Sequence, residues 1–314
     1  MAKFFITGGT GFIGSALVRS LIKKGESVVI FKRDKTSFWR LKDISKECEI
    51  ITGDLRDKSL KSKIKKIKPT YIFHLATYGA VPEEDDTDNL IDVNIKGTIN
   101  LFEAAKGVDV KLFVNTGSSS EYGVSKRAIK ESDPTFPIND YGISKLAATL
   151  YSKKEAERYL LPSITFRLFS PYGYFESSKR LIPSVVINAL QNKTISVGSP
   201  NNVRDFIFIE DVVNAYLLAT KAQHLPGSVY NIGSGQQHNV SDVVKCILHK
   251  SKSQSNVNWG AVKNQKRQIE PKKWQANITK AGKNFYWKPT YSFEEGIVKT
   301  IDWFYRNKSL YEEN

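Results

Sequence analysis

The stretch FFITGGTGFIGSALVRSLI, residues 4–22, decides the fold of this chain. It opens with a short apolar run, passes through Gly8, Gly11 and Gly14, and ends in a segment with apolar residues at helical spacing. In such a strand–loop–helix unit the first glycine permits a tight turn, the second lets backbone approach a pyrophosphate, and the third lets the helix pack on the strand. The N-terminus of the helix favours phosphate through its free N–H groups and its dipole. The stretch therefore predicts a dinucleotide-binding site.

The remainder of the first half alternates strand-like and helix-like segments. Strand-like runs cover residues 27–33, 49–55, 70–76, 111–118 and 164–170, and helix-like segments cover 58–68, 94–107 and 141–159. This alternation favours an α/β fold, a Rossmann-type doubly wound parallel sheet with a smaller mixed α/β substrate-binding domain. We expect the dinucleotide-binding domain to span 1–169, with a segment around 206–232 returning to it, and the smaller domain to span 170–314. Residues 255–287 look turn-rich.

Composition narrows the class of protein. The chain has 314 residues, 40% of them hydrophobic, with two cysteines, four histidines and a net charge of +15. The cysteines and histidines show no metal-ligand spacing, and no apolar run approaches a membrane span, so we expect no metal, no membrane contact and a cytoplasmic location. The basic residues are scattered, which favours a solvated surface over nucleic-acid binding and would speed encounter with a phosphorylated small molecule.

The segment YGISK places Tyr141 and Lys145 four residues apart, on one face of a predicted helix. Tyrosine alone is a poor acid or base at neutral pH because its pKa is near 10. A neighbouring cation favours the phenolate and brings the phenol closer to a useful range. The pair is therefore a candidate for proton transfer next to the predicted dinucleotide site.

Several further motifs share one resemblance. They are the TGxxGxxG spacing of residues 7–14, GDLRD (53–57), HLAT (74–77), NIKGTINLFEAA (94–105), YGISK (141–145), VRDFIFIEDVVNAY (203–216) and ANITKAGKNFYWKPTYSFEEGI (276–297). Together they resemble the extended short-chain dehydrogenase/reductase family, which contains nucleotide-sugar epimerases, dehydratases and reductases. The resemblance covers nearly the whole chain and is specific for the family, but not for one substrate. It implies a homodimer built on the helices at 94–106 and 141–159.

The resemblance also implies roles for individual residues. Tyr141 would exchange a proton with the sugar oxygen, Lys145 would lower its pKa and bind the cofactor ribose, and Ser118, four residues before Tyr122, would hydrogen-bond the reacting oxygen. Ser119 or Ser120 could replace Ser118 if the register were shifted by one. The expected cofactor-binding residues are Gly8, Gly11, Phe12, Ile13, Gly14, Lys32, Arg33, Asp54, Leu55, Leu75, Ala76, Thr77, Asn94, Tyr141 and Lys145. The expected substrate-binding residues are Tyr78, Ser119, Ser120, Ser170, Arg180, Leu181, Arg204 and Arg267.

Two departures from the family pattern bear on the reaction. The family's 4,6-dehydratases carry an acid and a base directly after the catalytic Ser or Thr, where this chain has Ser119 and Ser120, and Glu121 comes one residue late. Dehydration is therefore disfavoured. At the end of the second strand, where NAD-using members carry an acidic residue, this chain has Lys32 and Arg33, which suits the 2′-phosphate of NADP, although Asp34 follows.

These departures favour NADP(H)-dependent reduction of a nucleotide-linked 4-keto-6-deoxy sugar at C4, with NAD as the alternative cofactor. A nucleotide-sugar 4-epimerase with retained NAD is the second hypothesis, and a non-enzymatic NADP-sensing or RNA-binding member of the family is the third. The nucleotide base and the sugar stay open, because no motif distinguishes them.

Overall fold

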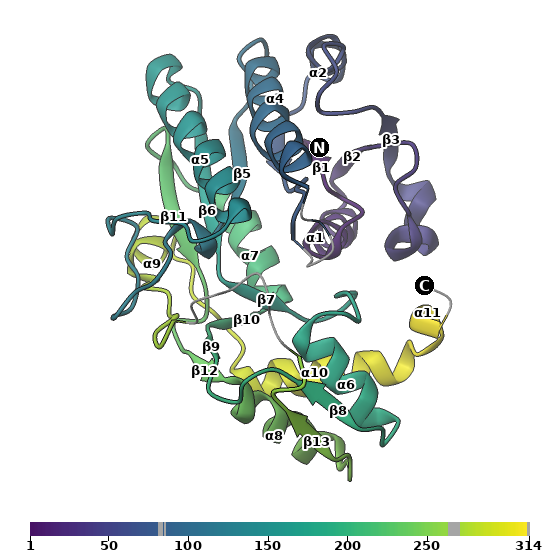
Figure 1. The fold of residues 1–314 in the computed structure, drawn as a ribbon. Helices are drawn as coiled ribbons and strands as arrows, with labels where there is room; N and C mark the ends of the chain where they lie inside the picture. The colour runs from purple at the N-terminus through teal and green to yellow at the C-terminus, as the bar shows by residue number, and fades with distance from the viewer. Residues whose placement is uncertain (81–83, 85, 263–270, 313–314) are drawn as a thin grey trace.

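The core of the protein is a parallel sheet with strand order β11-β6-β5-β4-β1-β2-β3, seen in Figure 1. The computed structural model describes residues 1–80, 84, 86–262 and 271–312. The strands of this sheet are β1 (Lys3–Thr7), β2 (Ser27–Lys32), β3 (Glu49–Thr52), β4 (Tyr71–His74), β5 (Leu112–Ser118), β6 (Ser163–Leu168) and β11 (Ser228–Ile232). All of its strand pairs are parallel. The predicted Rossmann-type α/β fold is thus confirmed.

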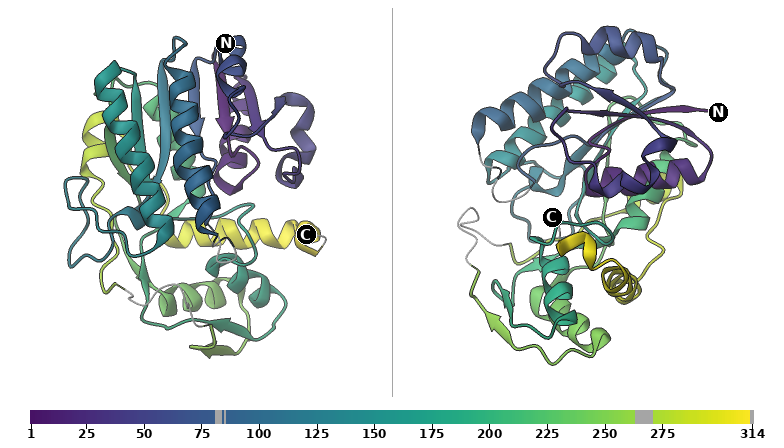
Figure 2. Two further views of the ribbon diagram at one scale, coloured as in Figure 1. Left: turned by 45° about the horizontal axis from the view of Figure 1, so that its top comes forward. Right: turned by 90° about the vertical axis from the view of Figure 1, so that its right-hand side faces the viewer.

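Helices cover both faces of the sheet, as the two views of Figure 2 show. α1 (Phe12–Lys23) and α7 (Ile209–Ala219) pack together on one face, and α2 (Leu60–Ile67), α4 (Gly97–Ala105) and α5 (Asp140–Tyr159) cover the other. Alternate residues of β1 serve the two layers: Phe4 and Ile6 join the α1 core, whereas Phe5 joins the α2 and α4 core. Side chains on a strand point to opposite faces in turn, so an unbroken apolar strand fits a sheet buried on both sides.

A smaller lobe lies below the carboxyl edge of the sheet in Figure 1. Its helices are α6 (Leu181–Leu190), α8 (Val240–Ser251), α10 (Phe293–Arg306) and α11 (Ser309–Glu312). Its short strands pair two by two, β7 (Ser170–Tyr172) with β10 (Phe206–Phe208), β9 (Val203–Arg204) with β12 (His238–Asn239), and β8 (Ile195–Val197) with β13 (Val257–Trp259).

Residues 255–287, predicted to be turn-rich, also contain two regular elements. β13 forms there because it pairs with β8, and α9 (Thr279–Phe285) forms because it packs against β11. Both partners are remote in sequence, so tertiary contacts override a local turn-rich composition. Across the described residues, no helix is both long and apolar enough to cross a bilayer.

The strand order reverses beside β1, which lies between β2 and β4. The chain crosses from β3 at one edge of the sheet to β4 on the other side of β1. Open α/β sheets bind ligands in the crevice at the carboxyl ends of the two strands where the order reverses, here β1 and β4. Three short helices flank this edge: η1 (Trp39–Glu47), η2 (Leu90–Lys96) and η3 (Ser119–Glu121). The π-helical segment η2 follows α3 (Thr87–Asn89) and leads directly into the α-helix α4.

Candidate active site

The glycine loop after β1 has the geometry that its sequence predicts. Gly8 adopts φ +69°, a left-handed conformation that side chains rarely tolerate, and its carbonyl accepts a hydrogen bond from the N–H of Gly11 at 3.0 Å. A Cβ on Gly14 would collide with the carbonyl oxygen of Gly8. The loop can therefore close tightly only with glycine at both positions.

The N–H groups at the N-terminus of α1 are available to a ligand. Its N-cap is Gly11, no side chain of the described residues caps the helix, and no acidic residue lies in the first turn. Uncapped N–H groups and the positive end of the helix dipole fit a pyrophosphate. The residues present thus fit a dinucleotide cofactor, with Gly11, Phe12 and Ile13 at its phosphates.

Arg40 lies beside this loop, and the sequence analysis missed it. Its guanidinium donates from Nη1 to the carbonyl of Thr10 at 3.5 Å and from Nε to the carbonyl of Phe175 at 2.8 Å. It links η1, the glycine loop and the segment after β7, which are far apart in sequence. Burial lowers the pKa of Arg40 from its ordinary value.

The two basic residues at the end of β2, Lys32 and Arg33, differ in their surroundings. The Lys32 ammonium donates to the carbonyls of Arg33, Asp34 and Thr36 at 3.1, 3.0 and 3.5 Å, so it organises its own loop. Arg33 is exposed. Its charge helps lower the pKa of Asp54, after the larger effect of hydrogen bonding to Arg56, so Arg33 lies near the Asp54 carboxylate.

Asp54 and Leu55 follow β3. The Asp54 carboxylate accepts from Nε and Nη2 of Arg56 at 2.9 and 2.7 Å, whereas Leu55 is buried in the sheet core. Arg56 therefore holds the Asp54 carboxylate in place at the sheet edge.

Asn94 in η2 holds the segment that follows β4. Its Oδ1 accepts from the N–H of Tyr78 at 2.8 Å and the hydroxyl of Thr77 at 3.1 Å, and its Nδ2 donates to the carbonyl of Tyr78 and the hydroxyl of Ser144, each at 2.9 Å. These bonds use its amide fully, so Asn94 supports the site by positioning Thr77 and Tyr78. Leu75 and Ala76 precede them, and Leu75 joins the buried core.

The helix carrying Tyr141 is placed by a close contact with the turn after β5. Asn139 caps α5 by accepting from the N–H of Gly142 at 2.7 Å. A Cβ on Gly142 would lie 2.5 Å from the carbonyl oxygen of Ser120. Because helix and turn touch there, Tyr141 comes next to Ser118, and hydrogen bonding with both Thr77 and Ser118 acts on its pKa.

Burial dominates the electrostatics of the predicted pair. Burial raises the pKa of Tyr141 above its usual value, and the positive charge that partly offsets this is that of Arg180. Burial lowers the pKa of Lys145 to about 8, and the charge of Glu121 acts against it. In this structure the pKa of Tyr141 is therefore high.

His74 lies beneath the site, between two hydroxyls. Its Nδ1 is 2.6 Å from Oγ1 of Thr7 and its Nε2 is 2.9 Å from Oγ1 of Thr98. Burial, with the charge of Lys145 adding to it, lowers the pKa of His74 to about 3. The ring is therefore neutral at physiological pH and joins three elements.

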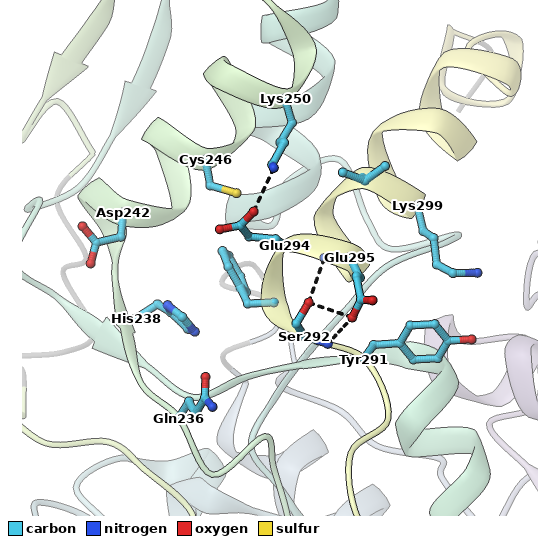
Figure 3. A pocket seen from close by; sticks show the side chains of 12 residues that line it. Gln236, His238, Asp242, Cys246, Lys250, Tyr291, Ser292, Glu294, Glu295 and Lys299 are labelled. Atoms are coloured by element: carbon cyan, nitrogen blue, oxygen red, sulfur yellow. Dashed lines mark hydrogen bonds and ion pairs between the residues drawn. The ribbon is translucent and has the colours of Figure 1, made fainter.

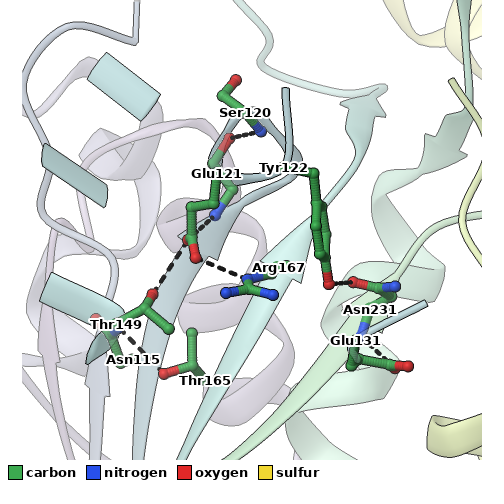
Figure 4. A network of polar contacts seen from close by, with 10 residues as sticks. Asn115, Ser120, Glu121, Tyr122, Glu131, Thr149, Thr165, Arg167 and Asn231 are labelled. Carbon is green, nitrogen blue, oxygen red and sulfur yellow. Dashed lines mark hydrogen bonds and ion pairs between the residues drawn. The ribbon is translucent and has the colours of Figure 1, made fainter. Parts of the chain in front are cut away.

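Glu121, in the turn after Ser118, has a buried carboxylate. Glu121 is 0% exposed, and it accepts from the N–H of Ser118 at 2.9 Å and from Nε of Arg167 at 2.7 Å (Figure 4). The Ser118 hydroxyl accepts from the N–H of Ser120 at 3.1 Å. Ser119 and Ser120 occupy the two positions directly after Ser118.

The expected substrate residues are spread over both lobes. Ser170 opens β7, two residues beyond Leu168, the β6 partner of Ser118, and Arg180, just before Leu181 of α6, donates to the carbonyl of Ala80 at 3.2 Å. Arg204 in β9 lies over the ring of Trp274, 5.8 Å from its centroid. Arg267 lies outside the described residues.

A separate hollow lies between α8 and α10 in the smaller lobe (Figure 3). Its lining includes His238, Cys246 and Lys250, and contains none of the predicted site residues. Lys250 pairs with Glu294 at 2.8 Å across it. Burial raises the pKa of Cys246, so this thiol is not activated as a nucleophile.

Comparisons with known proteins show the family to which this chain belongs. The model of the NAD dependent epimerase/dehydratase family matches residues 4–233. A dTDP-glucose 4,6-dehydratase from Haemophilus influenzae is 29% identical, covering 98% of this chain and 99% of that protein. A putative UDP-glucose 4-epimerase from Methanocaldococcus jannaschii is 27% identical, covering 96% of this chain and 98% of that protein.

Solved structures are similar over the whole chain. An epimerase from Methanothermobacter thermautotrophicus matches with a TM-score of 0.89 and 27% identity, covering 100% of this chain and 95% of that chain. A dTDP-glucose 4,6-dehydratase from Bacillus anthracis, solved in complex with NAD, matches with a TM-score of 0.88 and 24% identity, covering 100% and 99%. At that identity the second likeness concerns the fold alone.

Proposed function

Because this chain belongs to the NAD dependent epimerase/dehydratase family, we propose that it reduces a nucleotide-linked 4-keto-6-deoxy sugar at C4. The observation that carries this proposal is the place of Glu121, whose carboxylate is buried and bonded to Ser118, Thr149 and Arg167. The turn therefore presents hydroxyls where a dehydratase needs an acid and a base, and serine without a partner base does not remove a C5 proton at a useful rate.

The protonation state of Tyr141 supports reduction. Reducing a carbonyl requires a proton donor at the developing alkoxide, and burial raises the pKa of Tyr141, so that the phenol carries its proton at neutral pH. When bound, the nicotinamide cofactor would supply a hydride to the carbonyl carbon. Tyr141 would deliver the proton to the oxygen, and Ser118 would donate a hydrogen bond to that same oxygen as its charge grows.

NADP(H) is the cofactor that we infer, with NAD as the alternative. Lys32 and Arg33 stand at the end of β2, and the exposed guanidinium of Arg33 is suited to a 2′-phosphate because it binds two oxygens at once. Lys32 contributes indirectly, since its ammonium is bound to the carbonyls of its own loop. The family's name supports the alternative.

For the substrate we infer a nucleoside diphosphate sugar held between the lobes. Arg180 contacts the segment after β4 and acts on Tyr141 from the smaller lobe, which suits a ligand that both lobes touch. Arg204 and Ser170 are inferred to contact the diphosphate.

A homodimer is inferred from the outer face of η2 and α5. Ile91, Ile143 and Leu150 are 39%, 52% and 54% exposed there, and α4, α5 and η2 pack side by side. Large aliphatic side chains gathered on one face favour a partner surface.

The experiment is to identify the bound nucleotide and then the turnover. Purified protein would be extracted with acid for mass spectrometry, titrated with NADPH and NADH, and assayed for NADPH oxidation with nucleotide-linked 4-keto-6-deoxy sugars. We expect dissociable NADPH, weaker NADH binding, and turnover that Y141F abolishes. Tightly retained NAD without NADPH oxidation would contradict the proposal.

A 4-epimerase is the second candidate, because the same three catalytic residues and the same lack of a dehydratase pair suit it. The full-length similarity to the putative UDP-glucose 4-epimerase also favours it. Interconversion of UDP-hexoses by protein with retained NAD would establish this reaction. Salt-sensitive RNA binding without any turnover would instead favour a non-enzymatic role.

A further inference from the structure

A buried ion pair lies directly behind Ser118. The side chains of Glu121 and Arg167 are 0% and 5% exposed, and Arg167 Nε donates to Oε2 of Glu121 at 2.7 Å. The other carboxylate oxygen, Oε1, accepts from the N–H of Ser118 at 2.9 Å and from the hydroxyl of Thr149 on α5 at 3.1 Å. The pair thus connects β5, β6 and α5 behind the catalytic residues.

Stability alone does not account for such a pair. Removing two charges from water costs free energy that their attraction does not reliably return, and apolar replacements of buried pairs are often as stable. The surroundings instead fix the pair in one geometry. Arg167 lies over the ring of Tyr122 at 4.4 Å, and the Tyr122 hydroxyl donates to Oδ1 of Asn231 at 2.7 Å, as Figure 4 shows.

The carboxylate acts on the active site in two ways. It fixes the main chain of Ser118 through the N–H bond, and its charge favours the ammonium form of Lys145 against the effect of burial. His74 on β4 also interacts with Lys145, and it is neutral. Burial raises the pKa of Glu121, but the charge of Arg167 on β6 and the hydrogen bond from the N–H of Ser118 oppose this and favour the carboxylate.

We propose that Glu121 is a positioning residue that holds Ser118 and keeps Lys145 charged. The proposal rests on the proposed function in taking Lys145 as part of the catalytic set. In a closed site, an ammonium at Lys145 assists a cofactor ribose and the neighbouring phenol only while it is protonated. A buried anion one turn from the catalytic serine therefore extends the pH range over which the site is active.

The test is a direct titration of Lys145 in the full-length protein. Lysines would be labelled with ¹³C at Cε, the Lys145 signal would be assigned from the spectrum of K145R, and its chemical shift followed against pH. For the wild type we expect a midpoint near 8. For E121Q we expect a midpoint lower by about one pH unit or more, because the variant removes the opposite charge of Glu121, whose carboxylate is bonded to Thr149 one turn along α5 from Lys145.

T149V is the matched control. It removes another hydrogen bond from Oε1 of Glu121, at a site that is equally buried, but leaves the charge in place. Its Lys145 midpoint should equal that of the wild type. A shift as large as that of E121Q would mean that packing, rather than charge, sets the midpoint, and would overturn the proposal.

E121Q leaves Arg167 buried without its partner and can fail to fold for that reason. The double variant E121Q/R167Q removes both charges and avoids this, and it should show the lowered midpoint as well. An unchanged midpoint in either folded variant, or a wild-type midpoint at the ordinary lysine value of about 10.4, would overturn the proposal.

A second readout is the pH profile of kcat. Its alkaline limb should move to lower pH in the variants by the same amount as the NMR midpoint. Because the titration needs no substrate, the two proposals can fail separately. A wild type that does not reduce 4-keto sugars while the midpoint still shifts refutes only the reductase, and a working reductase with an immobile midpoint refutes only the role of Glu121.

Discussion

Replacing Gly142 with alanine should move Tyr141 away from Ser118. The added Cβ would lie 2.5 Å from the carbonyl oxygen of Ser120 and 2.9 Å from Cβ of Pro137. The first of these is backbone and cannot rotate away. To reach the 3.0–3.4 Å of a tight but tolerated contact, the helix and the turn must separate by 3.0 − 2.5 = 0.5 Å to 3.4 − 2.5 = 0.9 Å.

Two opposing effects decide the stability of G142A. Alanine in place of glycine favours a helix by up to about 1 kcal/mol, whereas overpacking costs about 1–3 kcal/mol. We expect overpacking to prevail, with a net loss of about 1 kcal/mol. Catalysis should suffer more, because a displacement of about 1 Å in a positioned group can cost on the order of 100-fold in rate. We expect kcat to fall by roughly 10- to 100-fold.

The matched control is G282A in α9. A Cβ there meets only the carbonyl of Trp287 at 3.5 Å, an ordinary contact, and the residue lies in a helix. It should keep wild-type kcat and gain stability. Urea unfolding and steady-state kinetics of both variants would test the reasoning, and a G142A protein with wild-type stability and kcat would refute it.

Three further outcomes follow from the structure. R33A should weaken NADPH binding about tenfold while leaving NADH binding unchanged, because one charge-assisted contact to the 2′-phosphate is lost. Fluorescence titration would measure both affinities, with K35A as the exposed neighbouring control. Equal losses of affinity for both cofactors would contradict this role of Arg33. Burial lowers the pKa of His74 to about 3. The neutral ring therefore contributes stability that is complete above pH 6.5, and the free energy of unfolding falls by about 1.4 kcal/mol per pH unit as the pH drops toward 3. The free energy of unfolding of H74Q, followed against pH, should lack this part of the acid dependence. I143E/L150E should convert a dimer into a monomer by light scattering, and a monomeric wild type would remove the basis for that interface.

Local sequence signals predicted the parts of the site that depend on short spacings. The glycine loop requires one turn and one helix start, and Tyr141 and Lys145 require one helix face, so each can be found within a few residues. The alternation of apolar strands with helices likewise predicted the parallel sheet, since an apolar strand flanked by helices has few other arrangements.

Contacts between distant segments could not be found in the same way. Arg40 reaches the carbonyl of Phe175, 135 residues along the chain, and Glu121 meets Arg167, 46 residues away. Neither arginine stands out in a chain with 47 basic residues. Their partners are set by sheet order and by the folding back of the smaller lobe, which are tertiary properties.

The protonation state of Tyr141 bears on the choice between reduction and epimerisation. An epimerase must remove a proton from a hydroxyl and later return one, so it needs a phenol that gives and takes with similar ease. A reductase needs only the donor form. In this structure burial raises the pKa of Tyr141, and the charge of Glu121 also raises it. Both effects stabilise the phenol relative to the phenolate, so Tyr141 begins the reaction as the protonated donor that a reduction requires, whereas an epimerase that starts from a sugar hydroxyl needs the phenolate first.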